Sequence, residues 1–151
     1  MNNTRLPEFY LIGIKIQTSN QNGQAMKDIP ALWEQFMQAD MPNIIPNKVD
    51  QNIYCAYTDY ESDWQAPYTC FLGCKVNSLD EIPEGMHSLL VPASDYFVKK
   101  VEQGLSGEII GNAWNEIWQS DLKRRYTVDF EVYYEESNQP DQAKLEIYIA
   151  I

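Results

Sequence analysis

The chain has 151 residues and a mass of 17.5 kDa, with 44% hydrophobic and 22% charged residues. This length and composition provide for one core and exclude wholesale disorder. Eleven Lys and Arg against 22 Asp and Glu give a formal charge of −11. This charge argues against direct nucleic-acid binding, because phosphates attract positive surfaces. A cationic small molecule suits the charge better, although acidic surfaces also simply keep proteins soluble.

The N-terminal residues MNNTRLPEF lack the basic and apolar regions of a signal peptide, and no apolar run approaches a membrane span, so a cytoplasmic protein without a membrane partner is expected. Cys55, Cys70 and Cys74 lie in strand-like apolar runs, where buried reduced thiols are common. With one histidine, His87, they offer too few ligands for a closed zinc site. We expect no metal and no cofactor.

The first half of the chain predicts a strand, a helix and two strands joined by a long acidic loop. The strands are expected at residues 8–17, 52–58 and 68–76, and the helix runs from Met26 to the Met41-Pro42-Asn43 sequence. Aromatic and β-branched residues dominate the strand segments, whereas apolar residues recur every three or four positions in the helix, which includes Trp33.

The second half repeats this order of elements. Strands are expected at residues 86–91, 95–102, 127–135 and 144–151, with a helix after Gly104 and a polar turn at 136–142. The apolar face of the helix carries Ile110, Ala113, Trp114, Ile117 and Trp118.

This repetition predicts an α+β fold within a single domain, residues 1–151. Two pseudo-two-fold-related strand-helix-strand-strand units, about 5–80 and 85–151, are expected to form one antiparallel sheet with both helices on one face. The other face should be free, and the seam between the halves is a natural place for a central cleft.

Six segments in this order and spacing resemble a known family. They are 10–14 (YLIGI), 29–33 (IPALW), 68–73 (YTCFLG), 113–118 (AWNEIW), 129–133 (DFEVY) and 145–151 (LEIYIAI). With these segments the chain resembles the GyrI-like domain, also called the bacterial transcription-activator effector-binding domain, and especially its stand-alone integron-cassette members.

The resemblance implies a cleft that is lined by aromatic residues and has a buried acidic residue at its centre. In family members fused to DNA-binding domains this cleft receives lipophilic cationic compounds, while other members bind gyrase or hydrolyse reactive small molecules. The expected function is therefore an effector-binding protein for lipophilic cations, acting as a sensor or sequestering module in transcription regulation or drug response.

Two strands offer the central carboxylate. In 127–135, alternation places Val128, Phe130, Val132 and Tyr134 on one side and Asp129, Glu131, Tyr133 and Glu135 on the other. We expect the first set to face the helices, and the second set to face either the cleft or solvent. The resemblance favours the cleft for Glu131 and Tyr133.

The last strand provides the rival carboxylate. Alternation sends Leu145, Ile147 and Ile149 inward and Glu146 and Tyr148 outward. A carboxylate surrounded by aromatic rings is costly to ionise, so it either has a raised pKa or pairs with a cation. Aromatic faces then add cation–π attraction, which gives selectivity for a lipophilic cation.

Further aromatic candidates for the cleft are assigned to neither the core nor the cleft by alternation alone. They are Tyr54, Trp64, Tyr68, Phe71 and Tyr96. Trp114 and Trp118 are four residues apart on one helix face, where packing against the sheet is the simplest interpretation, and Trp114 is kept as a candidate ligand contact. Trp33 is assigned to the core.

Two other functions are retained. One is general acid–base hydrolysis by Glu131 with Tyr133 or a cleft tryptophan, which turnover would reveal. The other is an acidic protein-interaction or inhibitor module, which would associate with a basic partner in a salt-sensitive way. A separate regulatory protein or a weak homodimer is the protein partner considered.

Overall fold

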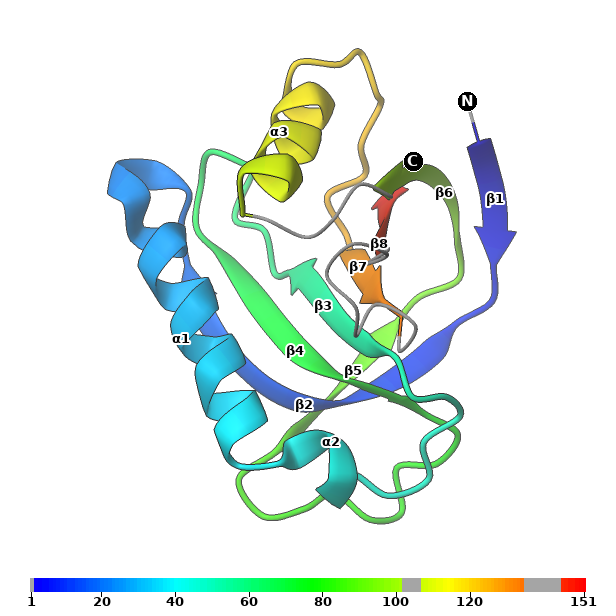
Figure 1. The fold of residues 1–151 in the computed structure, drawn as a ribbon. Helices are drawn as coiled ribbons and strands as arrows, with labels where there is room; N and C mark the ends of the chain where they lie inside the picture. The colour runs from blue at the N-terminus through cyan, green and yellow to red at the C-terminus, as the bar shows by residue number, and fades with distance from the viewer. Residues whose placement is uncertain (1, 102–106, 135–144) are drawn as a thin grey trace.

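The computed structural model describes residues 2–101, 107–134 and 145–151 (Figure 1). In chain order the elements are β1 (Asn2–Leu6), β2 (Phe9–Thr18), the 3-10 turn η1 (Gln21–Gly23), α1 (Gln24–Gln38), α2 (Met41–Ile44), β3 (Ile53–Thr58), β4 (Tyr68–Val76), β5 (His87–Val91), β6 (Ser94–Val101), α3 (Gly107–Trp118), β7 (Asp129–Tyr133) and β8 (Leu145–Ala150). The expected strands and both long helices are present. The turn expected at 136–142 lies outside the described residues.

All eight described strands join one antiparallel sheet in the order β1-β6-β8-β7-β3-β4-β2-β5. This confirms the α+β class with one antiparallel sheet. The sequence did not predict β1, because NNTRL has no apolar alternation and this edge strand is held by backbone pairing with β6. The short α2 was also missed, since four residues carry too little periodicity.

The strand order is unchanged when β1 to β4 exchange places with β5 to β8 and the sheet is read from its other end. β3 and β7 meet at the centre, as the expected duplication requires. The first strand of each half pairs with the opposite half, β1 with β6 and β5 with β2. Strand order therefore supports the duplication, while the unit bounds at about 5–80 and 85–151 stay a prediction.

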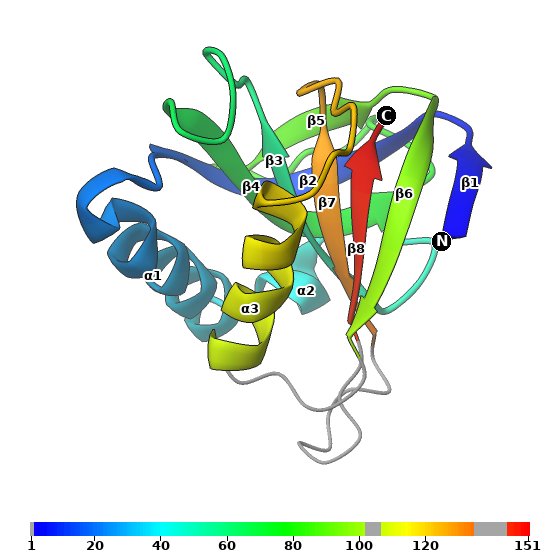
Figure 2. The ribbon, with the colours of Figure 1, turned by 90° about the horizontal axis from the view of Figure 1, so that it is seen from above.

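Both long helices lie on the same side of the sheet, as expected (Figure 2). Leu32 and Phe36 of α1 pack against the half that contains β2, β3 and β4. Ala113 and Ile117 of α3 pack against β6 and β8, where Leu145, Ile147 and Ile149 turn inward as alternation predicted. Within the described ranges, no helix combines the length and hydrophobicity needed to cross a bilayer.

The face of the sheet away from the helices is buried, although the sequence predicted it to be free. The sheet curls so that Phe9 of β2 meets Phe130 of β7 edge-on at 5.3 Å between ring centroids, although β3 and β4 lie between these two strands in the sheet. Phe130 also stacks on Tyr148 at 4.7 Å, and Tyr96 packs in the same cluster. Curvature thus gives this face a core of its own, and among the described residues no helix contributes to that core.

This second core corrects the predicted orientation of β7. Val128, Phe130 and Val132 belong to the cluster on the face away from the helices, and Tyr134 packs against it. Glu131 and Tyr133 face the helices instead. Alternation separated the two sets correctly, but both sides of this central strand are buried, so hydrophobicity could not identify the side under the helices. Glu135 lies outside the described residues.

The three cysteines are free and buried, and they pack in the core beneath α1. The Sγ atoms of Cys55 and Cys70 are 3.6 Å apart across neighbouring strands. Their environment agrees with the packing role inferred from the apolar runs around them.

Two glycines allow β2 and β4 to approach closely. Gly13 and Gly73 face each other in the register. A Cβ on Gly13 would overlap the carbonyl oxygen of Leu72, and one on Gly73 would overlap that of Ile12. We expect Gly13→Ala to lower the free energy of unfolding by about 1–3 kcal/mol.

Urea unfolding measures this effect, with Gly111→Ala in α3 as the matched control. A Cβ at Gly111 meets open space, so alanine there should raise the free energy of unfolding by up to about 1 kcal/mol through helix propensity. Equal changes for the two variants would contradict the steric explanation.

Candidate ligand-binding site

A cavity of about 800 Å³ lies between α1 and α3 above the centre of the sheet. Its floor includes Tyr57 of β3, Tyr68 of β4 and Glu131 of β7, and its walls come from the two helices. The aromatic side chains among its described lining residues are Trp33, Tyr57, Tyr60, Trp64, Tyr68, Trp114, Trp118 and Tyr133. This is the size range of small-molecule sites, and its lining is mostly apolar.

Helix periodicity positions the walls. Met26, Ile29 and Trp33 follow one another at three and four residues along α1 and form a stripe toward the cavity. The neighbouring stripe, Leu32 and Phe36, is buried against the sheet. One helix therefore serves both the core and the site.

Glu131 is the only acidic residue among the described residues that line the cavity. Its side chain is buried, with 1% of the residue exposed. Oε1 accepts hydrogen bonds from the hydroxyls of Tyr57 (3.1 Å) and Tyr133 (2.9 Å), and Oε2 accepts one from Nε1 of Trp114 (2.6 Å). Three neutral donors thus hold the carboxylate, and no cation within the described residues pairs with it.

Burial dominates the electrostatics of this group. Loss of solvation raises the pKa of Glu131 above the ordinary 4.5, and the hydrogen bonds from Trp114, Tyr133 and Tyr57 offset part of that rise. Burial also raises the pKa of Tyr57 and Tyr133 well above 10, so both hydroxyls stay protonated and donate. The floor therefore holds one acidic group in a poorly hydrated place.

The symmetry of the sheet explains why two tyrosines converge on one oxygen. Cys55 lies directly opposite Glu131 where β3 pairs with β7. Tyr57 follows Cys55 by two residues, as Tyr133 follows Glu131, so the two hydroxyls approach from the two halves. Because the position equivalent to Glu131 is a cysteine, the centre holds one carboxylate rather than two that would repel each other.

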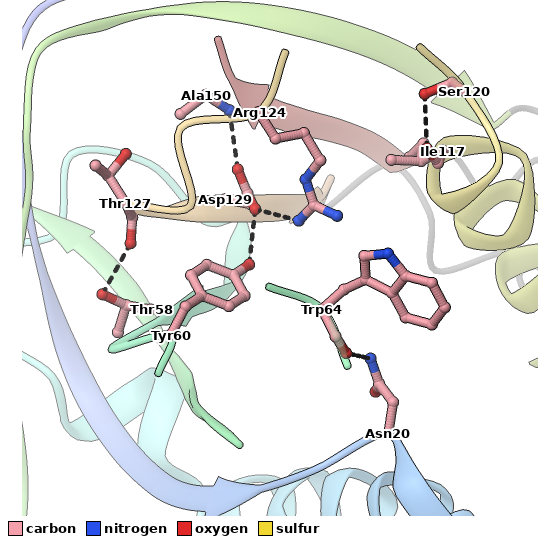
Figure 3. A network of polar contacts seen from close by, with 10 residues as sticks. All are labelled: Asn20, Thr58, Tyr60, Trp64, Ile117, Ser120, Arg124, Thr127, Asp129 and Ala150. Carbon is pink, nitrogen blue, oxygen red and sulfur yellow. Dashed lines mark hydrogen bonds and ion pairs between the residues drawn. The ribbon is translucent and has the colours of Figure 1, made fainter. Parts of the chain in front are cut away.

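The loop between β3 and β4 closes one side of the cavity. The ring of Trp64 stacks on Trp118 of α3 at 4.8 Å with planes 9° apart. Nδ2 of Asn20 donates to the carbonyl oxygen of Trp64 at 2.8 Å, and the Tyr68 hydroxyl donates to Oδ1 of Asn20 at 2.7 Å (Figure 3). These contacts fix the loop between the two halves.

A buried ion pair lies beside this loop (Figure 3). Asp129, which is fully buried, accepts a hydrogen bond from Nη2 of Arg124 at 2.7 Å. The Tyr60 hydroxyl donates to Oδ2 at 2.7 Å, and the backbone N–H of Ala150 donates to Oδ1 at 2.9 Å. Arg124 also lines the cavity.

The structure brings five of the candidate residues to the cavity: Trp64, Tyr68, Trp114, Glu131 and Tyr133. The other five are on the opposite face of the sheet, among or beside the second core: Tyr54, Phe71, Tyr96, Glu146 and Tyr148. Glu146 accepts hydrogen bonds from the Tyr134 and Tyr148 hydroxyls there. Glu131 and Glu146 are thus separated by the sheet.

Several lining residues were not singled out by sequence reasoning. Tyr60 and Arg124 lie in loops, where no periodicity assigns a direction. Tyr57 lies in a predicted strand, but only the register of β3 against β7 places it beside Glu131. Trp33 and Trp118, which were interpreted as core residues, line the cavity as well.

Comparison with known proteins identifies the family of this chain. Residues 4–151 match the family model "Integron-associated effector binding protein", called Cass2. The chain belongs to the Cass2 family. It is also 33% identical over 143 residues to the "Putative transcriptional regulator protein YobU" of Bacillus subtilis (strain 168), covering 92% of this chain and 89% of that protein.

Two solved structures show the same fold as this Cass2-family chain. The integron cassette protein VCH_CASS2 of Vibrio cholerae has a TM-score of 0.76 at 24% identity, covering 99% of this chain and 94% of that one. SAV2435, solved bound to tetraphenylphosphonium, has a TM-score of 0.79 at 17% identity, covering 99% and 92%. These likenesses show the fold, and the resemblance to stand-alone effector-binding proteins is confirmed by the family model.

Proposed function

We propose that the protein binds lipophilic cations in the cavity between α1 and α3, as a sensor or sequestering module for such compounds. The observation that carries the proposal is Glu131, a buried carboxylate that is held by neutral donors alone among the described residues. A cation that enters the cavity supplies the missing charge, and its apolar groups contact the aromatic walls.

The comparisons support this choice of ligand class and role. The family is one of effector-binding proteins, and SAV2435 was solved with a lipophilic cation. The name of the Bacillus subtilis relative supports a role in transcription regulation. Among the partners considered, a small molecule is the one that a cavity of this size suits.

Charge selectivity tests the proposal directly. Tetraphenylphosphonium and tetraphenylborate have similar shapes and opposite charges, so their comparison isolates electrostatics from apolar burial. We expect isothermal titration to show tighter binding of the phosphonium, and thermal melting to show that it stabilises the fold. Equal binding of both ions, or of neither, would contradict the proposal. Recovery of the phosphonium unchanged after long incubation separates binding from hydrolysis.

The affinity for the cation should also depend on pH. Above the raised pKa of Glu131 the carboxylate is charged and attracts the ligand; as the pH falls through that pKa, protonation removes the attraction. Affinity for tetraphenylphosphonium is therefore expected to fall on going from about pH 8 to about pH 4. Glu131→Gln, which cannot titrate, should show a flatter profile. A wild-type affinity that is constant over this range would be inconsistent with a charged Glu131 in the complex.

A further inference from the structure

Arg124 has hydrogen-bonding capacity that the fold leaves unused. Its side chain is 4% exposed, and Nη2 donates to Asp129. The guanidinium carbon lies 4.3 Å from the centroid of the Tyr126 ring. Nε and Nη1 are buried and have no acceptor among the described residues. A buried donor without an acceptor is unfavourable, and guanidinium offers five N–H donors in a fixed plane.

Asp129 does not satisfy these donors. Its Oδ2 already accepts from Arg124 Nη2 and from the Tyr60 hydroxyl, and its Oδ1 accepts from the backbone of Ala150. The ion pair balances the charge of the guanidinium, but its geometry leaves two nitrogens unused. The deficit at Arg124 is thus one of hydrogen-bond acceptors rather than of negative charge.

The position of Arg124 connects this deficit to the ligand site. Arg124 lines the same cavity as Glu131. Figure 3 shows its guanidinium group between Asp129 and Trp64, with one unbonded nitrogen on the side of Trp64. Trp64 is itself a lining residue.

We propose that Arg124 forms an acceptor subsite in the cavity, which binds an uncharged oxygen, such as a ketone, amide or sulfonyl oxygen, carried by a lipophilic cation. This inference rests on the proposed function and narrows its ligand class. The cationic centre is held by Glu131 and the aromatic walls, and the oxygen accepts hydrogen bonds from the unused guanidinium nitrogens. A ligand without the oxygen leaves these donors unsatisfied in the complex.

Matched phosphonium ligands test the subsite on the wild-type protein. The (acetylphenyl)triphenylphosphonium ions, with the acetyl group in the meta or para position, are compared with the corresponding isopropenyl compounds, in which a CH₂ group replaces the oxygen. Tetraphenylphosphonium is the reference for cation binding. We expect at least one acetyl isomer to bind about fivefold to fiftyfold more tightly than its isopropenyl counterpart.

Arg124→Lys removes Nε and Nη1 while keeping a positive charge near Asp129. In this variant the acetyl preference should fall to about onefold to twofold, whereas the affinity for tetraphenylphosphonium should change little. Arg125→Lys is the matched control, because Arg125 is exposed and its Nε donates to the carbonyl oxygen of Ile151. It should keep the wild-type preference.

The outcomes separate this inference from the proposed function. If tetraphenylphosphonium binds but neither acetyl isomer is preferred, the acceptor subsite is wrong and cation binding stands. If Arg124→Lys folds and keeps the preference, Arg124 is not the donor. If tetraphenylphosphonium does not bind, both proposals fail. Should Arg124→Lys not fold, the wild-type ligand pairs and Arg125→Lys still decide whether the oxygen is recognised.

Discussion

Glu131→Gln is expected to weaken tetraphenylphosphonium binding about tenfold to hundredfold, because it deletes the buried negative charge of the cavity. The substitution preserves shape and hydrogen bonding. The amide oxygen can accept from Nε1 of Trp114, and the amide nitrogen, in the place of Oε1, can donate to the hydroxyl oxygens of Tyr57 and Tyr133, which donate to Oε1 in the wild type. Isothermal titration at neutral pH measures the loss, and tetraphenylborate should bind the variant no less tightly than the wild type.

Glu146→Gln is the matched control for this experiment. Glu146 is also held by two tyrosine hydroxyls, Tyr134 and Tyr148, but on the face of the sheet away from the cavity. Its substitution should leave the affinity for the phosphonium within about twofold of wild type. A large loss in Glu146→Gln with no loss in Glu131→Gln would place the cation on the wrong side of the sheet for this proposal.

Asp129→Ala is expected to lower the free energy of unfolding by about 3–5 kcal/mol. The substitution leaves Arg124 as an unpaired buried cation and removes the acceptor of both the Tyr60 hydroxyl and the Ala150 N–H. Denaturant unfolding followed by tryptophan fluorescence measures the change. Asp129→Asn keeps the side-chain volume and one of the two acceptor oxygens, so it should be less harmful.

An exposed ion pair provides the comparison for Asp129→Ala. Arg5 and Asp95 are 3.5 Å apart on the surface, with 67% and 55% of their side chains exposed. Asp95→Ala should therefore cost at most about 1 kcal/mol, because solvent screens such pairs. If Asp129→Ala were no more destabilising than Asp95→Ala, the buried pair would not organise this end of the cavity.

Local pattern was sufficient for the fold class and for every described helix and strand except β1 and α2. The runs EFYLIGIKIQ and YTCFLGCKV predicted β2 and β4, and apolar residues at helical spacing predicted α1 and α3. The repeated order of these elements predicted one antiparallel sheet with both helices on one side. These features depend on residues close in the chain, whose periodicity reports burial directly.

Alternation also predicted correctly which side of β8 lies under the helices, but it predicted the wrong side for β7. On β8 one set is aliphatic and the other carries Glu146 and Tyr148, so the buried side under α3 is evident. On β7 the aromatic set with Phe130 is the more apolar, yet it packs in the second core formed by sheet curvature. Sequence alone left Glu131 and Glu146 as rivals for the same cleft.

The sequence by itself therefore determined the two long helices, most of the strands, the order of these elements, and the acidic and aromatic residues available for a site. Only the tertiary structure decided which of them meet. The register of β3 against β7 brings Tyr57 to Glu131, and the loops bring Tyr60, Trp64 and Arg124 to the same cavity. Periodicity cannot report such meetings, because they depend on sheet curvature and on loops, whose directions are set by contacts between residues far apart in the chain.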